Sequence, residues 1–270
     1  MLRLIAGTFS LFCFTSCFVY ILPEQPSLDA LARHQISQSE FSFSNIIIYL
    51  LSEPFSILFA SLFSSPIQFQ VSYACLALLM CSRILSIPLF YLGLFVLTPP
   101  GYLLALNITP SLIAFSIVNY HLLISNRLNK SWVILGVSNH LIAVLSVAGL
   151  LVKGVWHASI LKKLIIVTVG SVLCLILYPI ISSKIAIYAN VSGNQAHTLF
   201  AIFALLILAL SRRHSVRFSC FFYIIILVFA FTISTKIASR LSFGADLLIL
   251  HITYLQLHHY LCRLFPKSSR

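Results

Sequence analysis

Ionisable side chains inside apolar stretches are the residues of this sequence most able to carry chemistry. Glu53 is the only acidic residue between Phe41 and Ala245, and a proline follows it. One interpretation is an interfacial carboxylate at a turn. The other is a general base, or the partner of a cation, in a cavity. For that second role we name Arg240 as the partner, with Lys184 as the next choice.

Three further residues have two interpretations each. Arg240 is either a cation at the end of an apolar run or a phosphate ligand, because a guanidinium can bind phosphate through two hydrogen bonds. His140, beside Asn139, is either a packing and hydrogen-bonding residue or a proton acceptor. Asp246 is either a proton-relay acid or an acid near a helix start.

No residue pattern in the sequence indicates a metal or a cofactor. The spacing of His251 and His258 places them on one helical face, but no carboxylate or thiolate joins them convincingly. The seven cysteines lie inside apolar runs or at their ends, where they are small packing residues. The sequence also has no glycine-rich phosphate loop. We therefore expect neither metal nor cofactor.

The composition indicates a membrane protein. Hydrophobic residues make up 60% of the 270 residues and charged residues only 8%, whereas about a quarter of a soluble domain is charged. Such a chain has too little polar surface to cover a globule in water. We expect an all-α, polytopic membrane protein, with residues 1–270 forming a single domain of about eight to ten spanning or re-entrant helices.

The net charge of +12 does not indicate nucleic-acid binding. The basic residues form short clusters between apolar runs and no long basic face. Cytoplasmic loops of membrane proteins carry this bias, and an anionic lipid or a lipid-linked substrate would also suit it. We therefore expect membrane lipids, and no nucleic acid, as partners.

Apolar runs and turn residues predict the order of elements. The run Leu2–Leu22 is predicted as an uncleaved first span and not as a signal peptide. Residues 23–66 follow as an outer loop with an interfacial segment. Two further spans are predicted within 84–125, with a break between them at 98–101 or 107–110. Single spans are predicted at 67–82, 164–181, 199–210, 218–234 and 243–261. Polar loops are predicted at 182–197 and 235–242.

Charge bias predicts the orientation of these elements. The basic loop 212–217 lies inside only if Trp132–Val152 enters the membrane and returns, with His140 near the outer apex. A turn within the membrane is tolerated where it lines a cavity. This path places Glu53, Lys184 and Arg240 toward the outer face.

Four segments contain the candidate residues and follow one another along the chain. They are Tyr49-Leu50-Leu51-Ser52-Glu53-Pro54-Phe55, Ser138-Asn139-His140-Leu141-Ile142-Ala143, Lys184-Ile185-Ala186-Ile187-Tyr188 and Lys236-Ile237-Ala238-Ser239-Arg240-Leu241-Ser242. Taken in order, they resemble segments of EpsG-like proteins, the Wzy-type polymerases of bacterial surface polysaccharide, and their order and approximate spacing match over nearly the whole chain. Two places depart from the family: residues 107–111 lack its arginine–glutamine pair, and Phe55 replaces a glycine.

The resemblance implies an enzyme of the bacterial inner membrane. It would join oligosaccharide repeat units carried on a polyprenyl diphosphate, at the outer face, without a metal or a nucleotide. Other polysaccharide-assembly proteins are possible partners. The resemblance implies Glu53, His140 and Arg240 as catalytic residues and Lys184, Tyr188 and Lys236 as substrate-binding residues.

Two other classes of protein stay open. One is a transporter or flippase for a lipid-linked or anionic solute, and the other is a non-catalytic subunit of a polysaccharide-assembly complex. Transporters commonly have repeated halves with matching broken helices. The sequence shows no such repeat, which favours the enzyme.

Overall fold

The structure is a computed structural model, and it describes residues 25–38, 53–125, 127–155, 159–160, 168 and 193–264. Every regular element in these ranges is helical, which confirms the all-α expectation. The predictions for 2–22 and 164–181, and for Lys184 and Tyr188, lie outside the described residues.

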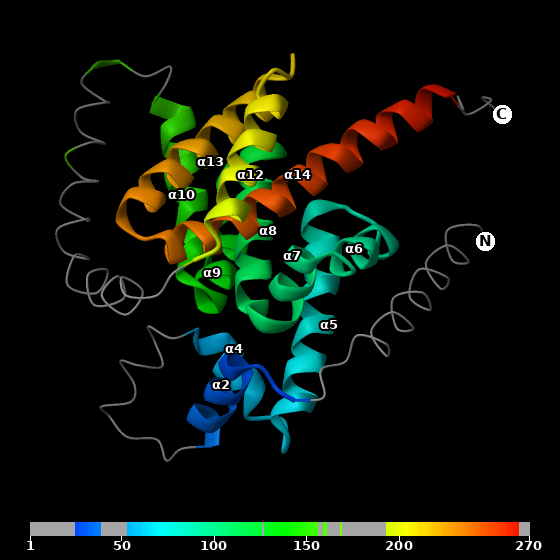
Figure 1. The fold of residues 1–270 in the computed structure, drawn as a ribbon, viewed down its shortest axis with the longest axis vertical. Helices are drawn as coiled ribbons and strands as arrows, with labels where there is room; N and C mark the ends of the chain where they lie inside the picture. Colours follow the sequence, from blue (N-terminus) through cyan, green and yellow to red (C-terminus); the bar gives the residue numbers. More distant parts are fainter. Residues whose placement is uncertain are drawn as a thin grey trace. The chain divides into compact units, whose positions relative to one another are not determined.

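The chain groups into two compact units. Figure 1 shows their helices, coloured along the sequence. The first unit comprises residues 1–120, 129–144 and 254–270, and the second comprises residues 121–128 and 145–253. Each unit is described by itself below. The expectation of a single membrane domain over residues 1–270 stays a prediction.

Helix α5, Pro66–Leu85, packs against four other helical segments of the first unit. Its first residue is a proline, whose fixed φ suits a helix start. It ends at Ser86, which has a φ of 55° and donates its N–H to the Ser82 carbonyl. This helix is long and apolar enough to cross a membrane, in agreement with the span predicted at 67–82.

Two short helices pack against the first half of α5. They are α2, Leu28–Gln38, and α4, Pro54–Ala60, and both come from the segment predicted as an outer loop and interfacial segment. Aromatic rings fill the contact between α4 and α5, with centroids 5.2–6.4 Å apart. These rings belong to Phe55, Phe59, Phe63, Phe69 and Tyr73. The short helices are therefore anchored on the long one by apolar contact.

The chain bends sharply after α6, Leu89–Val96. The next elements are α7, Pro99–Tyr102, and a π-helical turn, η1, Leu103–Asn107, and the bend between α6 and this pair is 105°. Helix α8, Thr109–Leu123, begins after a second break. The sequence offered 98–101 or 107–110 as the break, and the structure breaks at both places. The bent pair is either a broken span or a re-entrant loop.

The apolar run 132–152 is interrupted at His140. Helix α9, Lys130–Asn139, ends there because His140 is extended, with φ −162° and ψ 135°. A short 3-10 turn, η2, Leu141–Ala143, leads into α10, Val144–Val155. The predicted break at His140 is confirmed, and the re-entrant path through the membrane stays a prediction.

In the second unit, α12, Gln195–Leu208, packs beside α13, His214–Ile233. Helix α13 is long and apolar enough to cross a membrane, and α12 is a shorter apolar helix. The next helix, α14, runs without a break from Thr235 to Leu264. The predicted polar loop at 235–242 is therefore wrong. Those residues form the first turns of α14, since the segment contains no proline or glycine to end a helix.

The described residues show fewer spans than the sequence predicted. Two helices, α5 and α13, satisfy the length and hydropathy of a membrane span, and the bent pair raises the number to three. These apolar helices support a membrane protein. The expected eight to ten spanning or re-entrant helices are not confirmed within the part of the chain that the structure describes.

Candidate functional site

Glu53 has an unusual backbone conformation at the start of α4. Its φ of 66° and ψ of 62° lie in the left-handed region, which is uncommon for a residue other than glycine. The Glu53 carbonyl accepts hydrogen bonds from the Ser56 hydroxyl at 2.9 Å and from the Ser56 N–H at 3.0 Å. Strained residues of this kind cluster at functional sites. The backbone conformation therefore marks Glu53 as a candidate functional residue, as the sequence did.

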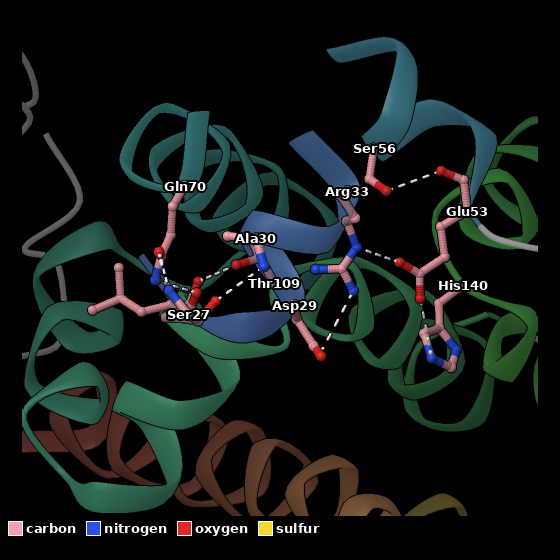
Figure 2. A network of polar contacts seen from close by, with 11 residues as sticks. Ser27, Asp29, Ala30, Arg33, Glu53, Ser56, Gln70, Thr109 and His140 are labelled. Atoms are coloured by element: carbon pink, nitrogen blue, oxygen red, sulfur yellow. Dashed lines mark hydrogen bonds and ion pairs between the residues drawn. The ribbon is translucent and has the colours of Figure 1, made fainter. Parts of the chain in front are cut away.

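The Glu53 carboxylate is paired with Arg33 of helix α2 (Figure 2). The Arg33 Nε donates to Glu53 Oε2 at 2.7 Å, and the guanidinium also lies 3.8 Å from Asp29 one turn earlier. The side chains of Arg33 and Glu53 are only 15% and 16% exposed. Burial alone would lower the pKa of the Arg33 guanidinium, but the two carboxylates outweigh it and raise this pKa. Arg33 is therefore a permanent positive charge beside Glu53.

His140 approaches the same carboxylate from the break after α9 (Figure 2). Its Nε2 lies 3.4 Å from Glu53 Oε1. Its Nδ1 accepts a hydrogen bond from the Ile142 N–H at 3.2 Å, so that nitrogen carries no hydrogen in this arrangement. The hydrogen-bond pattern thus assigns the ring hydrogen to Nε2. The imidazole presents a donor, and not an acceptor, to Glu53.

Buried polar contacts hold the elements that carry these three residues. The Tyr73 hydroxyl of α5 donates to the Asn139 side chain, which precedes His140. Asn139 donates in turn to the Leu135 carbonyl at 2.7 Å. Near the start of α2, Gln70 accepts from the Ser27 N–H and donates to the Leu106 carbonyl, each at 2.9 Å. These bonds tie α2, α9 and η1 to α5.

Sequence reasoning named two members of this cluster and missed the third. Glu53 and His140 were each named as candidate catalytic residues, and the structure brings them within 3.4 Å of one another. The cation expected beside Glu53 was Arg240, whereas the described partner is Arg33. A signal for Arg33 was present: Asp29 and Arg33 are spaced i,i+4, the spacing of an ion pair on a helix.

The other predicted site residues belong to the second unit or lie outside the described residues. Arg240 and Lys236 lie in the first turns of α14, in the second unit. Lys184 and Tyr188 lie outside the described residues. Among the residues that the structure describes, no group of three or more His, Cys, Asp or Glu side chains is arranged to hold a metal ion.

Comparison with known proteins adds no family. No protein-family model, no curated protein and no solved structure matches this chain. The site and the four sequence segments are therefore the features of this chain that indicate a function.

Proposed function

We propose that this chain is a membrane polysaccharide polymerase, which joins oligosaccharide repeat units carried on a polyprenyl diphosphate at the outer face of the bacterial inner membrane. The observation that carries the proposal is the Glu53 carboxylate between Arg33 and His140. Ionisable residues are costly in an apolar protein, and a partly buried cluster of them from three separate segments is a candidate site. The four segments that resemble EpsG-like polymerases include two of its members.

Glu53 is the proton acceptor in this proposal. The Arg33 guanidinium already contacts one oxygen of this carboxylate, Oε2, at 2.7 Å. The contact of Oε1 with His140 is longer, at 3.4 Å, so a substrate hydroxyl can approach Oε1. Since the His140 Nε2 carries a hydrogen, His140 positions the carboxylate and does not take the first proton.

The reaction is a glycosyl transfer. The acceptor hydroxyl oxygen forms a bond to the anomeric carbon of the donor sugar, and its proton passes to Glu53. The bond between that carbon and the diphosphate oxygen breaks, and the diphosphate leaves with the electron pair. Because Arg33 is engaged with carboxylates, the leaving charge needs other cations, for which we propose Arg240, Lys184 and Lys236, with Tyr188 contacting the substrate.

Deleting the chain in its own host tests this function. The polymerase proposal predicts single repeat units on the lipid carrier or surface anchor in place of long polysaccharide, visible as the loss of the ladder on a gel. Restoring the wild-type chain restores the ladder. Unchanged long-chain polysaccharide in a strain without a second polymerase contradicts the proposal.

The deletion strain also distinguishes a polymerase from the two other classes of protein, a flippase and a non-catalytic subunit. A flippase defect leaves repeat units on the inner face of the membrane, so none reach the surface. Loss of a non-catalytic subunit is repaired by any variant that inserts and assembles, including one without the Glu53 carboxylate.

A further inference from the structure

A second polar cluster lies in the second unit, between α12 and α14. The His197 Nε2 lies 2.7 Å from Asp246 Oδ2, and the His197 Nδ1 lies 2.9 Å from the Ser242 hydroxyl oxygen. Ser242 is completely buried and also lies 2.7 Å from the Ser239 carbonyl, one turn earlier on α14. The side chains of His197 and Asp246 are 15% and 16% exposed. The proposed polymerase chemistry uses none of these residues.

The single hydrogen of the Ser242 hydroxyl decides where the ring hydrogens lie. When Ser242 donates to the Ser239 carbonyl, it can only accept from the ring, so Nδ1 carries a hydrogen. One further proton then lies between Nε2 and Asp246, and the His197–Asp246 pair is neutral overall. When Ser242 turns and donates to Nδ1, that nitrogen has no hydrogen. Nε2–H then faces the Asp246 carboxylate, and the pair has a charge of −1.

These two arrangements differ by one proton and by one hydroxyl rotation. We infer that His197, Ser242 and Asp246 form a site that binds one proton reversibly, with the Ser242 hydroxyl turning between its two acceptors. The proton comes from water, which reaches the partly exposed ring, and it enters at Nδ1 while Ser242 turns to Ser239. This inference is independent of the proposed polymerase function.

The surroundings favour a site whose charge changes. Helix α12 carries no charged residue, and the half of α13 from Phe221 to Ile233 carries none, with Tyr223 its only titratable group. On α14 the cations Lys236 and Arg240 precede Ser242. The ring of Phe243 lies 5.1 Å from that of His197. A negative charge is costly among apolar residues, which favours the state with the proton bound, whereas the two cations of α14 favour the state without it.

Nitrogen NMR of isotope-labelled histidine rings in the full-length protein, reconstituted in lipid nanodiscs, tests the site directly. Loss of a signal in His197→Gln assigns the ring, and the exposed His214 serves as an internal reference. We expect His197 to have hydrogens on both nitrogens at acidic pH. At alkaline pH we expect a hydrogen on Nε2 only, because Ser242 then donates to Nδ1.

Two variants examine the parts of the site. Asp246→Asn removes the carboxylate that accepts from Nε2, and we expect part of the neutral ring to carry its hydrogen on Nδ1 at alkaline pH. Ser242→Ala removes the donor to Nδ1, while the Asp246 carboxylate still accepts from Nε2–H at 2.7 Å. We therefore expect the ring hydrogen to stay on Nε2 at alkaline pH and the Nδ1 signal to move to that of a nitrogen without a hydrogen bond. Thr253→Val is the matched control, because the exposed Thr253 hydroxyl bonds only to its own helix at Ile249.

Two results would overturn the inference. One is a His197 ring that keeps the same hydrogens at every pH where the protein stays folded. The other is a neutral wild-type ring with its hydrogen on Nδ1 at alkaline pH.

Discussion

Glu53 combines a strained backbone with a partly buried ion pair. The left-handed conformation costs a non-glycine residue about 1–2 kcal/mol, and it places the carboxylate between Arg33 and His140. A glycine would adopt this backbone without strain but would carry no carboxylate. The backbone strain at Glu53 thus coincides with a carboxylate that contacts two other ionisable residues, which is typical of a functional position.

Arg33→Lys tests the role of the guanidinium. An ammonium group cannot present the planar guanidinium fork to Glu53 and Asp29 together. A charge-assisted hydrogen bond contributes about 1.5–3 kcal/mol, so we expect polymer formation to fall by roughly tenfold or more. The amount of long-chain polysaccharide per inserted protein is the measurement. Arg83→Lys, an exposed arginine at the end of α5, is the control, and an equal loss in both variants argues against a specific role for Arg33.

Tyr73→Phe tests the support beneath His140. The variant leaves the buried Asn139 side-chain oxygen without its hydroxyl donor. We expect a loss of about 1–3 kcal/mol in stability, read as a lower thermal unfolding midpoint in detergent. The exposed Tyr260→Phe should leave the midpoint unchanged. A midpoint in Tyr73→Phe equal to that of the wild type would show that this bond does not stabilise the site.

Composition was enough to find Glu53, because a single acid in a long apolar stretch is visible without a structure. His140 could be found in the same way, because it is the one ionisable residue in the apolar run 132–152. Arg33 was missed because it lies in a polar segment, where a charged residue needs no explanation. The left-handed backbone of Glu53 could not be predicted either, since this conformation depends on the packing of α2 and α9 around α4.

The bend between α6 and α7 depends on a glycine. A Cβ atom on Gly101 would lie 1.9 Å from the Phe95 carbonyl oxygen, so Gly101→Ala requires the bend to open. We expect a loss of about 1–3 kcal/mol in stability. The control is Gly93→Ala on α6, where an added Cβ meets nothing within 4 Å. An unfolding midpoint in Gly101→Ala as high as in Gly93→Ala would contradict the close approach.

Element boundaries were predicted well where proline or glycine marks them. The start of α5 and the breaks around α7 follow such residues. The boundary before α14 was misplaced because Lys236 and Arg240 looked like loop residues. Polar residues alone do not end a helix, and the structure continues α14 through them.

The placement of basic residues predicts the orientation of the whole molecule. Arg212, Arg213 and Arg217 lie at the junction of α12 and α13, and such clusters favour the cytoplasmic side. Since α13 satisfies the criteria for a span, a reporter fused after Arg213 should lie inside and one fused after Ser234 should lie outside. Alkaline phosphatase activity and green fluorescence report the two sides. Phosphatase activity after Arg213 would reverse the orientation and contradict the re-entrant path at His140.

The central claim is that Glu53 takes the proton of an acceptor hydroxyl in polysaccharide chain growth. Its most direct test is the Glu53→Gln variant, which keeps the size of the side chain and removes its ability to accept a proton. The deletion strain carrying this variant is compared with one carrying the wild type or Glu24→Gln, at equal levels of inserted protein. We predict single repeat units for Glu53→Gln and long polysaccharide for the other two. Long polysaccharide of normal amount and length from Glu53→Gln would contradict the account.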